Sequence, residues 1–288
     1  MGSTTRPGGA KRWGRRAVRT AITGLLAAAL SLVGAPPAHA AVPYVALGDS
    51  YTSGLGTRSY YDDGSGCYRS PYAYPVLSAQ RLGASLTFAA CSGARTYDVR
   101  DKQLGFLSAT TQYVTVQVGG NDAGFASVIS KCAQPWPTTC WNEINNAKNV
   151  IQTTLPGRLD ELYGLIRSKA PNARVVVVGY PRLFNGEQCN LISRISPEEQ
   201  AELNATADLL STVIMGRAQA AGFIYVDPRP AFLGHAVCDD VEWINGASWP
   251  INESYHPNQA GHVGFTDLVE PRLRNGAAPV GHDNSTAV

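Results

Sequence analysis

The sequence predicts an α/β protein: a three-layer α/β/α fold with a mainly parallel central sheet. Short apolar strands alternate with amphipathic helical segments along the chain, which is the order of parallel sheets with crossover helices. The four valines between Arg174 and Gly179 have no polar gap, which is typical of a parallel strand covered on both faces. The chain has 288 residues, 44% of them apolar, enough for one large core.

Five segments have the length and composition of strands. They are, in order, 44–47, 85–89, 114–118, 174–179 and 223–226. In the third, Thr115 and Gln117 alternate with valines, which predicts one polar and one apolar face. Ligands bind at the carboxyl ends of strands in such sheets. The loops after Leu47, Ala89, Val118 and Val226 are therefore the places to look for chemistry.

Apolar residues at helical spacing predict two helices, and a third helix is expected later in the chain. Residues 155–166 form one, which Pro171 ends, and residues 203–214 belong to a second. The second begins with Ser196, Pro197 and Glu199, a capping box with proline in the first turn. The third helix is expected at 259–274.

Residues 1–40 have the plan of a secretory signal peptide. Six basic residues and no acidic one precede a 15-residue apolar run, two prolines and an Ala-His-Ala cleavage signature. The run is shorter than the ~18 residues of a membrane span, so no stable membrane anchor is expected. We expect export and cleavage after Ala40. The Arg15-Arg16 pair leaves both the general secretory and the twin-arginine routes open.

The charge of the remaining chain argues against nucleic acid as a partner. The whole chain has 24 basic and 22 acidic residues, but without the leader 18 basic residues face 22 acidic ones, a net charge of −4. Phosphate backbones require a basic surface. Residues 41–274 are predicted to form one domain and 275–288, rich in Gly, Ala and Pro, a loose tail. We expect a monomer.

Six cysteines remain after the leader: Cys67, Cys91, Cys132, Cys140, Cys189 and Cys238. An even number in an exported chain indicates disulfides, of which six cysteines allow fifteen connectivities. Zinc is the competing interpretation, but the chain lacks both a C-x-x-C pair and an H-E-x-x-H motif. Neither a metal nor a cofactor is expected.

Four motifs occur at the expected loops and late in the chain. They are Gly48-Asp49-Ser50, Cys91-Ser92-Gly93, Gly119-Gly120-Asn121-Asp122 and His256-Pro257. In this order they resemble the SGNH (GDSL) hydrolases, and with the six cysteines they look most like the secreted streptomycete lipases and esterases. The resemblance covers the mature chain and implies a flavodoxin-like sheet. The G-x-S-x-G elbow of α/β-hydrolases is absent from the mature chain.

The resemblance implies that Ser50 is the nucleophile and His256 its base. A serine hydroxyl attacks an ester only when a base takes its proton. Among the other histidines of the mature chain, His235 is the serious rival, whereas His262 is expected to pack or face solvent and His282 lies in the tail. We expect activity to decline below about pH 6.5 as the base becomes protonated.

The resemblance also assigns the oxyanion donors to the backbone N–H groups of Ser50 and Gly93 and to the Asn121 amide. Many members have Asp three residues before the histidine, where this chain has Glu253. Glu253 could orient the histidine, or a backbone carbonyl of Glu253 or Ser254 could do so. Both remain open. Asp49 and Asp122 are expected to accept backbone hydrogen bonds.

The resemblance further implies three sequential disulfides: Cys67–Cys91, Cys132–Cys140 and Cys189–Cys238. The predicted activity is that of a secreted carboxylic ester hydrolase acting on acylglycerol-type esters. A phospholipase A or a carbohydrate O-deacetylase could use the same machinery. A secreted binding module with a dead site is the alternative outside enzymes. Acyl-chain preference and interfacial activation are not determined by the sequence.

Overall fold

The computed structural model describes residues 40–135, 137–189 and 195–275. The central sheet has five strands, β1 (Pro43–Gly48), β2 (Ser85–Phe88), β3 (Tyr113–Gln117), β4 (Arg174–Val178) and β5 (Ile224–Val226). All neighbours are parallel, in the order β2-β1-β3-β4-β5. The five predicted strands and the parallel sheet are confirmed.

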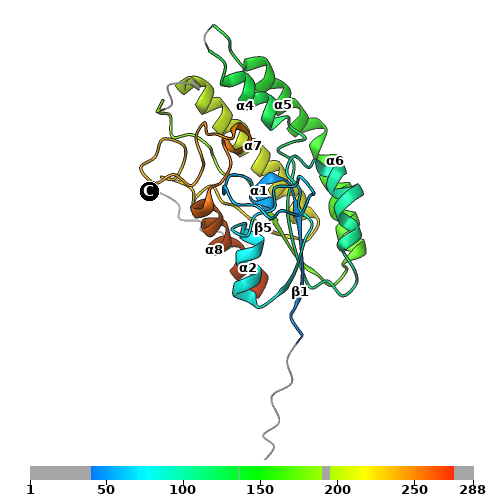
Figure 1. The fold of residues 1–288 in the computed structure, drawn as a ribbon. Coiled ribbons are helices and arrows are strands. Elements are labelled where there is room, and N and C mark those ends of the chain that lie inside the picture. Colours follow the sequence, from blue (N-terminus) through cyan, green and yellow to red (C-terminus); the bar gives the residue numbers. More distant parts are fainter. Residues whose placement is uncertain (1–39, 136, 190–194, 276–288) are drawn as a thin grey trace, which may run out of the picture. The chain divides into compact units, whose positions relative to one another are not determined.

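The strand order reverses beside β1, because β2 and β3 lie on its two sides. The crossovers that follow β1 and β3 therefore run in opposite directions, and this opens a crevice at the carboxyl ends of these two strands. In Figure 1, α2 (Tyr74–Leu82) and α8 (Gln259–Asn275) lie together on one side of the sheet, and α6 (Leu155–Lys169) lies on the other side. Helix α7 (Pro197–Ala220) packs against α6 and follows β4. The predicted three-layer architecture is confirmed.

Two further helices extend beyond the carboxyl edge of the sheet. They are α4 (Phe125–Cys132) and α5 (Trp141–Thr153), seen at the top of Figure 1. Helix α4 packs on α5, and α5 packs on α6 and α7. The short segments are α1 (Ser50–Ser53), α3 (Thr96–Asp98), the π-helix η1 (Val99–Gln103) and the 3-10 helices η2 (Leu104–Phe106) and η3 (Ile251–Glu253).

Strand β3 differs from the prediction of one polar face. Both Thr115 and Gln117 are fully buried, because helices cover the sheet on both sides. Within the described chain, the Thr115 hydroxyl and the Gln117 amide nitrogen have partners inside the core, whereas the Gln117 Oε1 has none. The Thr115 hydroxyl is 2.9 Å from that of Tyr44, and the Gln117 amide donates to the Gly179 carbonyl at 2.7 Å. Polar residues in this strand therefore reflect internal hydrogen bonding rather than solvent exposure.

The predicted helix boundaries agree with the structure at their caps. Ser196 accepts from the Glu199 N–H while the Glu199 side chain accepts from the Ser196 N–H, and Pro197 occupies the first turn. Helix α8 includes Asn275, one residue beyond the predicted end. The predicted leader, apart from Ala40, and the tail from 276 onward lie outside the described residues.

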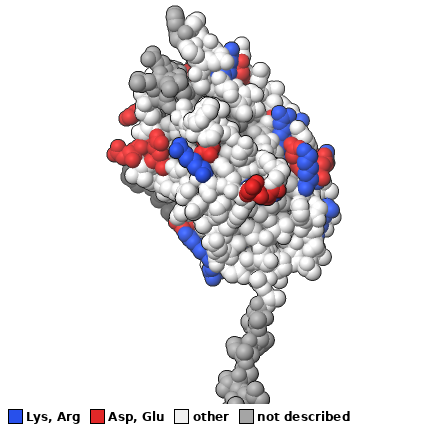
Figure 2. Space-filling view, viewed as in Figure 1, with Lys and Arg blue, Asp and Glu red and all other residues white. Residues whose placement is uncertain are grey.

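All six cysteines are paired as expected, in Cys67–Cys91, Cys132–Cys140 and Cys189–Cys238. The first bridge joins the loop after α1 to the loop after β2. On the face shown in Figure 2, basic and acidic side chains stand side by side in small groups, and much of the surface is uncharged. No helix in the described ranges is long and apolar enough to cross a membrane.

Candidate active site

Ser50 lies where β1 ends and the short helix α1 begins, at the carboxyl edge of the sheet. Gly48 ends the strand with φ +142°, and a Cβ there would lie 2.4 Å from the Gln117 carbonyl oxygen, so only glycine fits. Asp49 caps α1 by accepting from the Tyr51 N–H at 3.0 Å. This tight turn presents the Ser50 side chain at the crevice beside β3.

His256 meets Ser50 across 206 residues of chain. Its Nε2 is 2.8 Å from the Ser50 Oγ, and its Nδ1 is 2.9 Å from the Ser254 carbonyl oxygen. An Nδ1–H that donates to this carbonyl leaves Nε2 as the acceptor of the serine proton. Tyr255, which lies between Ser254 and His256 in the chain, has φ +59°. The Tyr51 hydroxyl donates to the Tyr255 carbonyl at 2.8 Å. This left-handed turn positions the Ser254 carbonyl toward the ring.

Burial determines the protonation of His256. Desolvation disfavours the imidazolium and lowers the pKa of His256 to about 4, while the hydrogen bond to the Ser254 carbonyl opposes this shift. The ring is therefore neutral, and able to accept a proton, at all pH values well above 4. The acid limit of activity is expected near pH 4, below the pH 6.5 predicted for a solvated histidine.

Glu253 is buried, but its carboxylate is directed elsewhere. One oxygen accepts from the Tyr60 hydroxyl, and the other lies 3.5 Å from the Arg58 Nε. The group that meets His256 Nδ1 is the Ser254 carbonyl. Of the alternatives left open by the sequence, the arrangement corresponds to a Ser–His pair oriented by a backbone carbonyl.

The other histidines stand apart from Ser50. His235 stacks on Trp243 with ring centroids 3.9 Å apart, and its Nδ1 is 2.7 Å from the Val241 carbonyl. His262 is fully buried in α8 and its Nδ1 accepts from the Tyr74 N–H at 3.3 Å. Burial lowers the pKa of His262 to about 3. His282 lies outside the described residues.

The three expected oxyanion donors come from the loops after β1, β2 and β3. Gly93 has φ +80°, and the added Cβ of a larger residue would meet no described atom, so its conformation rather than space favours glycine. The Asn121 amide donates to the Ala94 carbonyl at 3.1 Å, which joins two of these loops. Within the described ranges, the N–H groups of Ser50 and Gly93 have no acceptor in the protein. Both are free to bind an oxyanion.

The two motif aspartates accept backbone hydrogen bonds, as expected. Asp49 accepts from Tyr51, and Asp122 accepts from the Thr96 N–H at 2.9 Å. Asp122 also pairs with Arg158 at 2.9 Å. Burial raises the pKa of Asp49 to about 7, and a hydrogen bond from the Tyr180 hydroxyl opposes this shift.

Sequence reasoning missed Tyr180 and Gln103. The Gln103 side chain binds both the N–H and the carbonyl of Gly48, at 2.8 and 2.9 Å. Tyr180 lies in the loop after β4, and its hydroxyl donates to Asp49 and accepts from the Gly120 N–H at 3.4 Å. The rule that selected the other loops could have selected this one, whereas nothing in the sequence marks Gln103.

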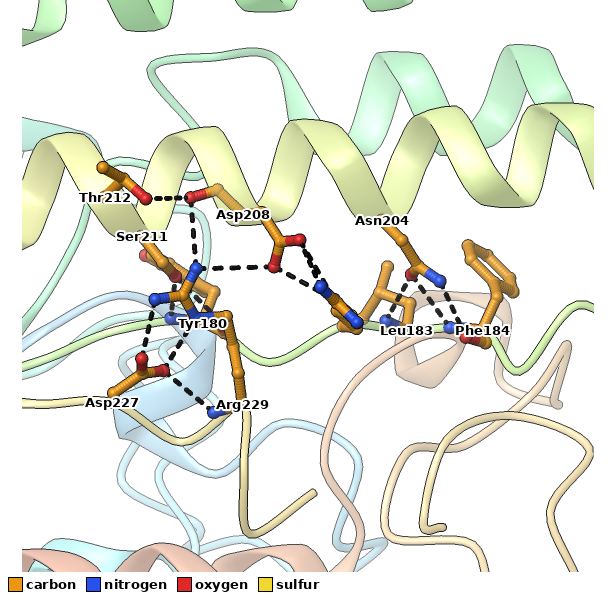
Figure 3. A network of polar contacts seen from close by, with 10 residues as sticks. Tyr180, Leu183, Phe184, Asn204, Asp208, Ser211, Thr212, Asp227 and Arg229 are labelled. Atoms are coloured by element: carbon orange, nitrogen blue, oxygen red, sulfur yellow. Dashed lines mark hydrogen bonds and ion pairs between the residues drawn. The ribbon is translucent and has the colours of Figure 1, made fainter. Parts of the chain in front are cut away.

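Helix α7 holds the Tyr180 segment in place. Figure 3 shows the Tyr180 backbone bound by Ser211, which accepts from its N–H at 3.0 Å and donates to its carbonyl at 2.8 Å. Asn204, two turns earlier on the same face of the helix, accepts from the N–H groups of Leu183 and Phe184 at 3.0 and 3.2 Å. The Tyr180 ring is thereby held beside Ser50.

An apolar pocket begins at Ser50 and extends between helices α4, α5 and α7. Its walls are mostly hydrocarbon side chains, Phe125, Val128 and Ile129 from α4, Ala147 and Ile151 from α5, and Leu203, Ala207 and Leu210 from α7. Asn121 and Tyr180 lie at the end near Ser50. Such a pocket suits an alkyl chain whose attached carbonyl group would lie at Ser50. No cluster of metal-ligating side chains occurs among the residues described.

A doubly wound sheet with a serine and a neutral imidazole at its carboxyl edge is the arrangement of hydrolases with a serine nucleophile. The sequence model of the GDSL-like lipase/acylhydrolase family matches residues 46–263. Lipase 1 of Streptomyces coelicolor is 44% identical over 248 residues, 83% of this chain and 91% of the relative.

Two solved structures are similar throughout. The extracellular lipase of Streptomyces rimosus has 40% identity and a TM-score of 0.75, covering 80% of this chain and 98% of its own. Phospholipase A1 of Streptomyces albidoflavus NA297 has 43% identity and a TM-score of 0.75, covering 83% of this chain and 100% of its own. The chain belongs to the GDSL-like lipase/acylhydrolase family and is a carboxylic ester hydrolase.

Proposed function

We propose that this protein is an exported serine esterase or lipase that cleaves acylglycerol-type esters through an acyl-enzyme on Ser50. The observation that carries the proposal is the 2.8 Å contact between Ser50 Oγ and His256 Nε2 at the mouth of an apolar pocket. Relatives named lipase at 42–44% identity support the same reaction class.

The reaction begins with attack of Ser50 Oγ on the ester carbonyl carbon while His256 Nε2 takes the hydroxyl proton. The Ser254 carbonyl holds the ring tautomer and stabilises the imidazolium. His256 then gives its proton to the leaving alcohol as the C–O bond breaks. A water molecule, deprotonated by His256, attacks the acyl-enzyme and releases the acid and Ser50.

Negative charge develops on the former carbonyl oxygen during both attacks. We assign its stabilisation to the N–H groups of Ser50 and Gly93 and to the Asn121 amide. The loops that carry them are joined to each other: the Cys91 N–H donates to the Gly48 carbonyl at 3.0 Å, and the Asn121 amide binds the Ala94 carbonyl. Fixed donors of this kind typically contribute several kcal/mol to transition-state binding.

The pocket favours esters of fatty acids over acetyl esters. An acetyl group would leave most of the apolar walls from α4, α5 and α7 unfilled, and burial of methylenes is what stabilises binding in such a pocket. This disfavours the carbohydrate O-deacetylase. A phospholipase A activity remains the second candidate, since the pocket accepts an acyl chain and a relative named phospholipase A1 is 43% identical.

Export rests on residues 1–40, for which we propose the role of a signal peptide cleaved after Ala40, with residues 41–274 as the catalytic domain and 275–288 as a tail. Three disulfides support an oxidising destination. We further propose that the enzyme is a monomer. Amino-terminal sequencing of secreted protein and size-exclusion chromatography check these points.

The direct test is Ser50→Ala. We expect it to abolish hydrolysis of p-nitrophenyl esters without changing the thermal midpoint, and to abolish labelling by a fluorophosphonate probe. Ser53→Ala, three residues on in α1, serves as the matched control for labelling. Labelling at another residue, or turnover by Ser50→Ala, would contradict the mechanism. An unlabelled wild-type enzyme would favour the dead binding module.

A further inference from the structure

We propose that residues 248–254 form a lipid-docking loop whose tip, Trp249 and Ile251, inserts into the uncharged or zwitterionic surface of aggregated ester substrate. The proposal rests on the ester hydrolysis proposed above and adds a second surface to it. We call this segment the docking loop.

The tip of the docking loop is apolar and exposed. The Trp249 side chain is 86% exposed and Ile251 is 69% exposed, the highest values among the large apolar residues of the described chain. Pro250, between them, and Asn252, after them, are also exposed. The ten residues between Glu242 and Glu253 contain no charged side chain. Exposed apolar residues gathered in one place mark an interaction surface.

The base of the docking loop is held by hydrogen bonds. The Ser248 N–H donates to the Ser254 Oγ at 2.9 Å, which closes the loop. The 3-10 helix η3 leads from Ile251 to Glu253, just before Ser254. The buried Glu253 carboxylate accepts from the Tyr60 hydroxyl. The Glu253 and Ser254 N–H groups donate to the Pro250 and Ile251 carbonyls at 3.0 and 3.1 Å, so the backbone of the tip is also held, while its side chains are exposed.

The docking loop is continuous with the catalytic pair. Ser254, whose hydroxyl closes the loop, also supplies the carbonyl that meets His256 Nδ1 at 2.9 Å. A lipid surface at the tip would therefore lie beside the site that consumes its molecules. A substrate with an alkyl chain long enough to fill the pocket beside Ser50 is itself poorly soluble and aggregates in water.

The chemistry of the tip favours a lipid surface without net charge. Tryptophan is enriched at membrane–water interfaces, where its ring lies at headgroup depth. The tip has no Lys or Arg to attract anionic headgroups, and Arg58 at the base is 3.5 Å from the Glu253 carboxylate. Attraction to the surface must therefore come from apolar burial.

The test uses vesicles of ether-linked phosphatidylcholine, which an esterase cannot hydrolyse. Binding is measured by sedimentation for the wild-type enzyme, Trp249→Ala/Ile251→Ala and the control Phe106→Ala, whose side chain is 55% exposed on η2. We expect the double variant to lose at least about tenfold in partitioning and the control to match the wild type. Both variants should hydrolyse soluble p-nitrophenyl butyrate like the wild type, whereas activity on emulsified triglyceride falls in the double variant alone.

Three outcomes would overturn the docking loop. They are equal vesicle binding by the double variant and the wild type, an equal loss in Phe106→Ala, and binding that requires anionic lipid. Absence of butyrate hydrolysis by the wild-type enzyme would instead overturn the proposed function, because that assay needs no lipid surface. Trp249→Phe, which keeps an aromatic ring, should retain most of the binding.

Discussion

The hydroxyl of Tyr180 joins the loop of the nucleophile to the loop of an oxyanion donor. It donates to the buried Asp49 carboxylate, next to Ser50, and accepts from the Gly120 N–H, next to Asn121, at 3.4 Å. The tyrosine backbone is itself bound by Ser211 of α7. One hydroxyl thus links the two loops that carry the proposed oxyanion donors Ser50 and Asn121.

We expect Tyr180→Phe to lower kcat by about tenfold or more with little change in KM, because the donors are misaligned only slightly but act in the transition state. Loss of this hydrogen bond also removes a contact that lowers the pKa of Asp49, so kcat and KM of the variant and the wild type are compared at the same pH by steady-state kinetics. Tyr44→Phe removes another buried tyrosine hydroxyl, which contacts Thr115 in the core, and is the control. Equal losses in both variants would indicate packing alone.

The pH profile of the wild-type enzyme tests the burial of His256. A pKa lowered to about 4 means that the ring is neutral, and active, above that pH, and that kcat/KM falls as the pH drops through 4. We expect half of the maximal kcat/KM near pH 4, measured with an ester that is stable in acid. Because the pKa of Asp49 is about 7, its ionisation could also appear in the profile. Asp49→Asn removes this carboxyl group, so that any remaining inflection belongs to another group. An inflection near 6.5 that persists in Asp49→Asn would show a solvated histidine.

Glu253→Gln distinguishes a carboxylate from a carbonyl as the partner of His256. The amide can still accept from the Tyr60 hydroxyl, and the Ser254 carbonyl is unaffected. We therefore expect kcat to fall by less than about tenfold, whereas loss of an orienting carboxylate costs about 10⁴. Single-turnover kinetics on a soluble ester measures this. A loss above a thousandfold would establish Glu253 as the orienting group.

Ala207→Phe tests the pocket as the acyl site. Ala207 lines the pocket from α7, so a phenyl group there should shorten the space for an acyl chain. We expect kcat/KM to fall by at least about tenfold for decanoyl esters and by less than twofold for butyryl esters. Ala205→Phe, on an exposed position of the same helix, is the matched control. Parallel losses for both chain lengths would exclude the pocket as the acyl site.

Much of the fold is predictable from local sequence. The uninterrupted valines of β4 and the capping box at Ser196 specify their elements through neighbouring residues, and both occur as predicted. The prediction of a solvent-facing polar side for β3 was wrong. The alternation of residue types shows which residues are polar, but it does not show whether a helix covers that face of the sheet. Thr115 and Gln117 find their partners on other segments, Tyr44 and Gly179.

The motifs by themselves indicated the family, which the comparisons confirm, and they supplied the proposed nucleophile Ser50, the proposed base His256 and the proposed donor loops. Only the tertiary structure decided that the Ser254 carbonyl rather than the Glu253 carboxylate meets His256, and that Tyr180 joins two donor loops. It also decided the lowered pKa of His256. These properties depend on distances between segments far apart in the chain and on exclusion of water by packing, and neither is encoded in the spacing of residues along it.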